Sequence, residues 1–407
     1  MAGRCPGGCS FCSHGILECI NFKPLTAEDV EYMRQTLHVT VIEAVSDDYS
    51  ICCIINTGTE CVAPPSPFAT CDGIFYIWVL RVSAWIVSLA ALVTNLIVLI
   101  GRLKTRQLDA TNAKPTENIF LVNLAVADFL MGAYLLAIAI TDAWFGSDYF
   151  LYSNTWRTGP TCGIIGVIGV LSSVVSLLDL TIITIDRFFC IVFPFGKIHF
   201  NPKWGKISCS IIWMIGIAIA ILPLFLSHSV QNFYGYTDVC LGLPIVAIPQ
   251  KVSQSLVERG NIILHVGYTF EAIPTWVYSA VIYTYLSSVC LFIVTACYIY
   301  MFISVLKTRQ DSHRASGSND EVKLATRISI IVGTDMLCWL PVIILSVLSQ
   351  FRVQIPSKTN QWLVVFVIPI NSALNPFIFS YGIIKARKTS APGQSQEMRE
   401  KPKGCFP

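Results

Sequence analysis

Charged residues are scarce in this sequence. Asp, Glu, Lys and Arg together make up 13% of the 407 residues, while hydrophobic residues make up 54%. The charged fraction is about half of that in ordinary soluble domains. A chain with so little charge cannot cover the surface of a soluble protein of this size. The net charge of +3 gives no indication of a nucleic-acid partner, and none is expected.

Motifs of the common enzyme classes are also absent from the sequence. It contains no nucleophile elbow, no glycine-rich phosphate loop and no metal-protease helix, so we expect no catalytic activity. No repeat relates the two halves of the chain, which weighs against a secondary transporter. A transporter remains one alternative to a receptor, and a non-signalling or decoy membrane protein is another.

Apolar runs dominate what is present. Seven of them are long enough to cross a bilayer, which takes about 20 residues. Prolines inside these runs are tolerated in membranes because neighbouring helices satisfy the freed carbonyl groups. We expect an all-α membrane protein, a bundle of seven transmembrane helices with a short cysteine-rich extracellular N-terminal segment. The expected helices cover about 78–102, 119–141, 162–187, 207–227, 276–305, 322–351 and 362–384.

The distribution of Lys and Arg predicts the orientation. Nineteen of the 28 basic residues follow spans one, three and five or lie in the tail. The positive-inside rule places these segments in the cytoplasm and the N-terminus outside. We therefore expect a multi-pass protein of the plasma membrane, with an extracellular segment 1–77, a bundle 78–384 and a cytoplasmic tail 385–407. Residues 1–30 lack the apolar core of a signal peptide, so either span one acts as the anchor or the true start is missing.

Cysteines gather in the outer segments. The eight within residues 1–77 predict a disulfide framework, for which 105 pairings are possible, and zinc binding at the Cys9-x-x-Cys12 spacing is the rival interpretation. They are Cys5, Cys9, Cys12, Cys19, Cys52, Cys53, Cys61 and Cys71. Cys162 begins span three and Cys240 follows span four, so a bond between them would tie the start of span three to the loop after span four. That loop, residues 228–275, is long enough for a hairpin or a lid over the bundle.

Acidic residues inside the apolar runs need an explanation. A charge near the bilayer centre costs about 2.5–3.5 kcal/mol, and such residues usually face the bundle interior. Asp128, Asp179 and Asp335 occupy spans two, three and six. For Asp128 we favour an ion or proton site that is coupled to a conformational switch. For Asp179 we favour a structural role.

Several short motifs occur in order along the spans. They are Asn95 in "TNLIVLI", Asp128 in "LVNLAVAD", Cys162, Asp186-Arg187-Phe188, Trp213, "CWLP" from Cys338 to Pro341, and Asn375-Pro376. This ordered set resembles the rhodopsin-like (class A) G-protein-coupled receptors over residues 78–384. "TDMLCWLPV", "VIPINSALNPFIF", "NLAVADFLMGAYL" and "FYGYTDVC" are similar to the leucine-rich-repeat receptors, and above all to the relaxin-receptor branch. The N-terminal segment resembles the cap and hinge of such receptors without the repeats between them.

The resemblance implies roles for individual residues. A switch that couples to a heterotrimeric G protein would comprise Asp186, Arg187, Glu321, Trp339, Pro341, Tyr298, Asn375, Pro376 and Phe379, with Arg187 paired to Asp186 and locked across the bundle by Glu321. A sodium pocket would comprise Asn95, Asp128, Ser176, Asn371 and Asn375. Phe379 stands where the family has tyrosine, which removes a water-mediated bond to span five. By position, Asp179 should approach Asn123 and Trp213.

The resemblance also implies partners. The ligand would be an extracellular peptide or protein hormone of relaxin or insulin-like type, and the bilayer would surround the bundle. No cofactor is expected other than a sodium ion at Asp128.

Overall fold

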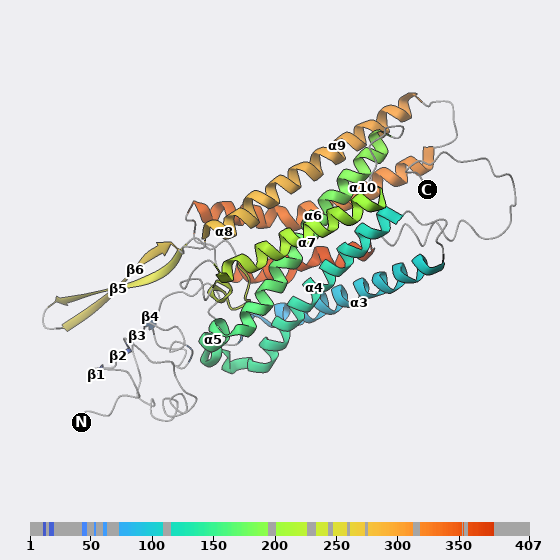
Figure 1. Ribbon diagram of the computed structural model, residues 1–407. Helices are drawn as coiled ribbons and strands as arrows, with labels where there is room; N and C mark the ends of the chain where they lie inside the picture. Colours follow the sequence, from blue (N-terminus) through green and yellow to red (C-terminus); the bar gives the residue numbers. More distant parts are fainter. Residues whose placement is uncertain are drawn as a thin grey trace.

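The computed structural model describes residues 11–13, 16–19, 43–46, 53, 60–62, 73–108, 115–193, 201–225, 233–242, 247–258, 261–272, 276–311, 318–351, 353 and 357–377. For some of them, including 247–258, 261–272, 318–332 and Asp335, only the backbone is described. Long helices run beside one another and form an elongated bundle, with the labelled strands gathered at one end (Figure 1). The predicted all-α bundle is therefore confirmed for the apolar part of the chain.

The helices follow the predicted order of spans. They are α3 (Trp78–Leu108), α4 (Pro115–Phe145), α5 (Tyr149–Thr158), α6 (Pro160–Val192), α7 (Pro202–Phe225), α8 (Trp276–Ala280), α9 (Ser287–Asp311), α10 (Ser318–Gln350) and α11 (Ser357–Trp362). Several begin earlier than the apolar runs, and three begin at a proline. Proline suits the first helical position because its fixed φ is already helical and that position needs no N–H donor. Hydrophobicity alone does not detect these first turns.

Two spans contain a π-helical turn. The turn η4 (Val281–Leu286) joins α8 to α9, and η5 (Leu363–Val367) joins α11 to the helical residues 368–377. In η4 the wider turn leaves a carbonyl group at Ile282, which accepts a hydrogen bond from Ser287 Oγ at 3.0 Å. Thr284 in the same turn bonds Ser346 and Gln350 of α10. A π-turn and its hydroxyl groups therefore shape the fifth span.

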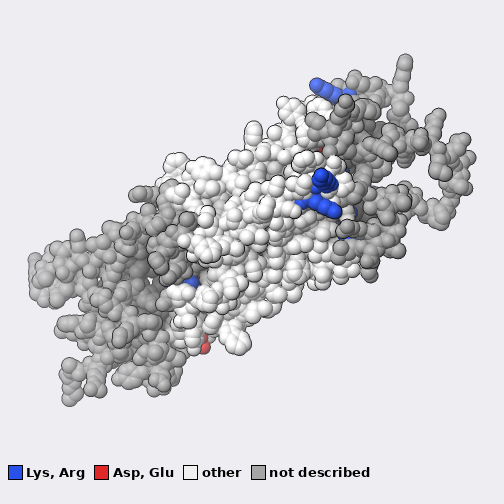
Figure 2. Space-filling model, viewed as in Figure 1, with Lys and Arg blue, Asp and Glu red and all other residues white. Residues whose placement is uncertain are grey.

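The side of the bundle is apolar. Large hydrophobic side chains such as Ile97, Met214 and Phe292 are more than 60% exposed. Figure 2 shows a broad band without charge between the two ends, with Lys and Arg gathered at one of them. Five helices of the described chain are long and apolar enough to cross a membrane, and the remaining two predicted spans contain the shorter apolar stretches Met336–Gln350 and Leu363–Phe377. Such a belt is expected of a surface that faces lipid.

The two ends of the bundle differ in structure. We call the end that carries the bond between Cys162 and Cys240 the disulfide end, and the opposite end, where α6 finishes, the Arg187 end. At the disulfide end, β5 (Ala247–Glu258) pairs antiparallel with β6 (Asn261–Ala272) in a hairpin that extends away from the helices (Figure 1). Of the two forms expected for this loop, a hairpin is observed over residues 247–272.

A small sheet lies within the N-terminal segment. It contains β1 (Phe11–Ser13), β2 (Ile16–Cys19), β3 (Glu43–Ser46) and β4 (Glu60–Val62) in that order. The first two strands are antiparallel, and the later neighbours are parallel. Most of the eight N-terminal cysteines lie outside the described residues or are described only by their backbone, so their pairing stays a prediction.

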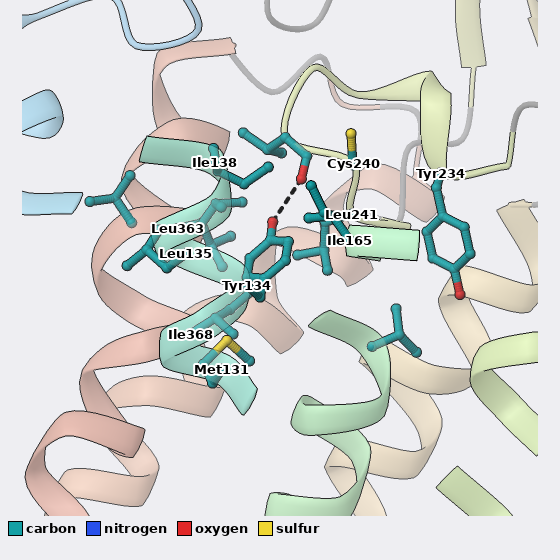
Figure 3. Close-up of a cluster of buried hydrophobic side chains, with 14 of the residues drawn as sticks. Met131, Tyr134, Leu135, Ile138, Ile165, Tyr234, Cys240, Leu241, Leu363 and Ile368 are labelled. Carbon is teal, nitrogen blue, oxygen red and sulfur yellow. Dashed lines mark hydrogen bonds between the residues drawn. The ribbon is translucent and has the colours of Figure 1, made fainter. Parts of the chain in front are cut away.

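The largest hydrophobic core lies toward the disulfide end. Tyr134 and Leu135 of α4 pack there with Ile165 of α6 and with Leu241 from the loop after α7 (Figure 3). Trp339 and Cys338 of α10 belong to the same cluster and are 8% and 5% exposed. Close packing in this core thus joins helices from both halves of the chain.

Candidate functional site

The carboxylate of Asp128 forms the centre of a polar site inside the bundle. Its side chain is fully buried in α4. Ser176 of α6 donates a hydrogen bond to Oδ1 at 2.9 Å, and Asn375 donates from Nδ2 to Oδ2 at 2.8 Å. One carboxylate therefore joins three separate spans through neutral donors.

Asn95 brings a fourth span into this site. Its Nδ2 donates to the carbonyl oxygen of Ala91 at 2.8 Å and to that of Ser372 at 3.0 Å. Asn371 is also buried, at 5% exposure. The structure therefore joins Asp128, Ser176 and Asn375 directly and ties Asn95 to the seventh span at Ser372. For Asn371 it shows burial.

The donor set of this site suits a hard cation. Carboxylate, hydroxyl and amide oxygens are the ligands that such cations prefer. Among the described side chains, the ion pairs of Arg81, Arg157 and Arg187 all involve acids other than Asp128. The described ranges contain no group of three or more His, Cys, Asp or Glu that could hold a metal. A cation at Asp128 would therefore depend on one carboxylate and neutral oxygens.

Asp179 behaves differently from the expectation. Trp213 of α7 donates from Nε1 to Asn123 Oδ1 at 3.0 Å, and Asn123 donates from Nδ2 to the Ile119 carbonyl at 2.8 Å. These bonds use the groups that were expected to meet Asp179. Both oxygens of Asp179 are buried and accept no hydrogen bond from the part of the chain that the structure describes. The polar contact between α4 and α7 thus forms without the acid.

At the Arg187 end, the arginine has a partner that the sequence did not suggest. Arg187 Nη2 lies 2.8 Å from Glu117 Oε2, in the first turn of α4, and each side chain is 31% exposed. Tyr298 packs nearby in a buried cluster with Met301 and Phe188. The side chains of Glu321 and Asp335 and the whole of Phe379 lie outside the described residues. The lock between Arg187 and Glu321 therefore stays a prediction.

The loop after α7 enters the disulfide end of the bundle. Val239, Cys240 and Leu241 are at most 1% exposed. Tyr134 of α4 donates to the Val239 carbonyl at 2.8 Å, the bond drawn in Figure 3, and Trp156 Nε1 donates to the Asp238 carbonyl at 2.9 Å. We call residues 233–242 the plug, because they fill the space between the helices at this end.

Covalent and steric features hold the plug in place. The predicted bond between Cys162 and Cys240 is confirmed, with the sulfur atoms 2.01 Å apart. Cys240 adopts φ 51, and its N–H bonds the Thr237 carbonyl at 3.0 Å. A Cβ atom at Gly166 would overlap the ring of Tyr234 and the Cys240 carbonyl. Only glycine therefore lets α6 approach the plug this closely.

A buried acid fastens the plug to α5. Asp238 lies 3.6 Å from Arg157 Nε and accepts a hydrogen bond from Tyr149 at 2.8 Å. Burial raises the pKa of Asp238, while Arg157 and the Tyr149 bond oppose that rise. The plug is thus held by one disulfide and by polar groups of α4 and α5.

A second acid fixes the segment that precedes α3. Asp142, near the end of α4, accepts hydrogen bonds from the backbone N–H groups of Ile74 at 2.8 Å and Phe75 at 3.2 Å. It also pairs with Arg81 of α3 at 2.6 Å. Ile74 and Phe75 are fully buried. The chain that links the N-terminal segment to the bundle is therefore packed into the bundle itself.

Sequence reasoning missed Glu117, Asp142 and Arg81. Each lies near the end of a span, where a charge is unremarkable because it can reach water. The sequence does show acidic and basic residues at the ends of neighbouring antiparallel spans. This pattern suggests which residues could form ion pairs, but it does not determine which of several nearby charges will pair.

Comparison with known proteins identifies the family of this chain. The model of the 7 transmembrane receptor (rhodopsin family) matches residues 94–379. The chain is 32% identical to the G-protein coupled receptor GRL101 of Lymnaea stagnalis over 340 residues, which are 84% of this chain and 28% of that receptor. It is 32% identical to human relaxin receptor 2, covering 74% of this chain and 37% of that receptor. It is 30% identical to the follicle-stimulating hormone receptor of Cairina moschata, covering 82% and 42%.

The chain thus spans between about a quarter and two fifths of the length of these relatives. The match nevertheless includes the Asp128 site, Arg187 and the plug. The resemblance to the relaxin receptors is confirmed, and the chain belongs to the rhodopsin family of seven-transmembrane receptors.

Proposed function

We propose that this chain is a G-protein-coupled receptor of the plasma membrane, with the disulfide end outside the cell and the Arg187 end in the cytoplasm. It would convert the binding of an extracellular peptide or protein hormone, of relaxin or insulin-like type, into activation of a heterotrimeric G protein. The observation that carries the proposal is the Asp128 site, which joins three spans through one carboxylate between these two ends.

The plug and the Asp142 contacts support a ligand that acts from outside. The plug fills the disulfide end of the bundle, so a large ligand has little room between the helices there. The ligand would therefore act on the plug, on the hairpin β5–β6 or on the segment that Asp142 holds. A change at the plug or at the segment before α3 reaches α4 directly, because Tyr134 and Asp142 both lie on that helix.

The Asp128 site would transmit this change along the bundle. In the resting state Asp128, Ser176, Asn95, Asn371 and Asn375 would hold a sodium ion. A bound cation would supply positive charge to the carboxylate and so favour the arrangement that gathers these oxygens. A ligand that favours another arrangement would weaken cation binding, since the coupling between two sites is reciprocal. Trp339 and Pro341 of α10 lie on the span that would then move.

At the Arg187 end, the arginine would contact the G protein, with Asp186 beside it. Tyr298 would support the active arrangement of α9 next to α6. Phe379 replaces the tyrosine of the family, so this support would lack one water-mediated bond. Non-signalling capture of a ligand is the alternative function, and it does not need Arg187.

Orientation and ligand response test the proposal together. An epitope tag at the N-terminus should be accessible to antibody on intact cells, whereas a tag at the C-terminus should require permeabilised cells. Cells that express the chain should change second-messenger levels when relaxin or insulin-like peptides are added, and cells that express Arg187→Ala at the same surface level should not. Peptide binding with no response by the unmodified chain would favour the capture function.

A further inference from the structure

The ion pair at the Arg187 end joins two spans that pack along one another. Glu117 lies in the first turn of α4, and Arg187 lies in the last two turns of α6. Their charged atoms are 2.8 Å apart. The pair therefore joins α4 directly to α6.

A second arginine lies close enough to affect this pair. Arg102, near the end of α3, is attracted by Glu117 and repelled by Arg187. One carboxylate thus attracts guanidinium groups from two different helices, and it forms an ion pair with that of Arg187. The charge of Arg102 therefore competes electrostatically with Arg187 for Glu117, because it attracts the same carboxylate and repels the other guanidinium group.

We propose that Glu117 is a positioning residue that holds Arg187 in the resting state, and that a G protein engages Arg187 only after this pair opens. The inference rests on the proposed function, in which Arg187 contacts the G protein. It adds a restraint on α4 to the lock on α10 that the sequence predicts at Glu321. The two restraints lie on different helices and can open separately.

The competition with Arg102 gives the proposal two effects of opposite sign. Removal of the Glu117 charge frees Arg187, so basal coupling should rise. Removal of the Arg102 charge leaves Arg187 as the partner of Glu117 and removes the repulsion between the two arginines. The pair should then be tighter, so basal coupling should fall. A purely structural role for this cluster would predict loss of stability and of coupling in both variants.

The test uses the full chain, purified and placed in lipid nanodiscs. Basal nucleotide exchange is measured on a panel of heterotrimeric G proteins for Glu117→Gln, Glu117→Asp and Arg102→Gln. Lys203→Gln serves as the control for charge at the same end, because Lys203 is exposed. Amide hydrogen exchange at the Arg187 ends of α6 and α10 is measured in parallel, since it reports the opening without a G protein.

Glu117→Gln should raise basal exchange about two- to sixfold, because partly exposed pairs contribute at most about 1 kcal/mol. The basal exchange rate of Glu117→Asp should lie close to that of the unmodified chain. The rate of Arg102→Gln should be lower than that of the unmodified chain. Added salt should raise the rate of the unmodified chain and have less effect on Glu117→Gln. Amide exchange should be faster in Glu117→Gln and slower in Arg102→Gln.

Unchanged rates of nucleotide and amide exchange in Glu117→Gln would overturn the inference, and so would a rise in Arg102→Gln. If neither the unmodified chain nor any variant stimulates a G protein, the proposed function fails. The amide exchange then still decides whether Glu117 restrains Arg187, so the two failures are distinguishable.

Discussion

The Asp142 contacts allow a quantitative prediction about how the segment before α3 is held. Asp142→Ala removes the acceptor of two buried backbone N–H groups, at Ile74 and Phe75, and the partner of Arg81. Each unsatisfied buried donor costs about 1–3 kcal/mol. The Arg81 side chain is 36% exposed and can turn toward water. Loss of its ion pair with Asp142 therefore adds little to the destabilisation. The total destabilisation should be roughly 3 kcal/mol.

Asp142→Asn should have a smaller effect. Its oxygen still accepts from the two N–H groups, but the charge-assisted bond to Arg81 is lost, at a cost of about 1 kcal/mol. The exposed acid Asp148, in the turn η1 (Gly146–Asp148) just after α4, provides the matched control Asp148→Asn. We therefore expect the control to be the most stable variant, Asp142→Asn to be less stable, and Asp142→Ala to be the least stable.

Thermal unfolding in detergent checks this order. A thiol-reactive dye reports unfolding, because Cys209 and Cys290 are buried free cysteines in the folded chain. A loss of about 3 kcal/mol should lower the melting temperature by roughly 5–10 °C. If Asp142→Ala melted at the same temperature as Asp148→Asn, the contacts of Asp142 would not hold the segment and the reasoning would be refuted.

Three further predictions concern the plug and the polar site. Gly166→Ala should displace the plug, because the new methyl group would overlap Tyr234 and the Cys240 carbonyl; melting as high as the unmodified chain would contradict this. Cys162→Ser should destabilise the chain by about 2–5 kcal/mol, and non-reducing peptide mapping of the unmodified chain should recover Cys162 joined to Cys240. Asp128→Asn should abolish the effect of sodium on basal coupling or on ligand affinity, whereas an equal sodium response in both proteins would reject the cation site.

The sequence predicts the bundle well because its signals are strong and local. Seven apolar runs, with basic residues at alternate ends, leave few other arrangements for a membrane chain. The convergence of Asn95, Asp128 and Asn375 on the bundle interior was also predictable, since polar groups in lipid usually face the interior. Ser176 was implied by the family resemblance, because the spans contain many other buried hydroxyl groups.

The ends of the helices are harder to predict. Glu117 and Asp142 lie where side chains can also reach water, so no energetic necessity selects their partners. The contact between Trp213 and Asn123 shows the same difficulty inside the bundle, because both the amide nitrogen and the amide oxygen of Asn123 find partners other than Asp179. The choice between close polar partners depends on side-chain geometry that spacing does not reveal.

Nucleotide exchange by a purified G protein tests the central claim most directly. The full chain in nanodiscs should accelerate exchange on at least one heterotrimeric G protein relative to empty nanodiscs. Arg187→Ala should return the rate to that of empty nanodiscs, with a melting temperature close to that of the unmodified chain because the Arg187 side chain is partly exposed. An Arg187→Ala protein that accelerates exchange as well as the unmodified chain would contradict the account, since coupling would then not pass through Arg187.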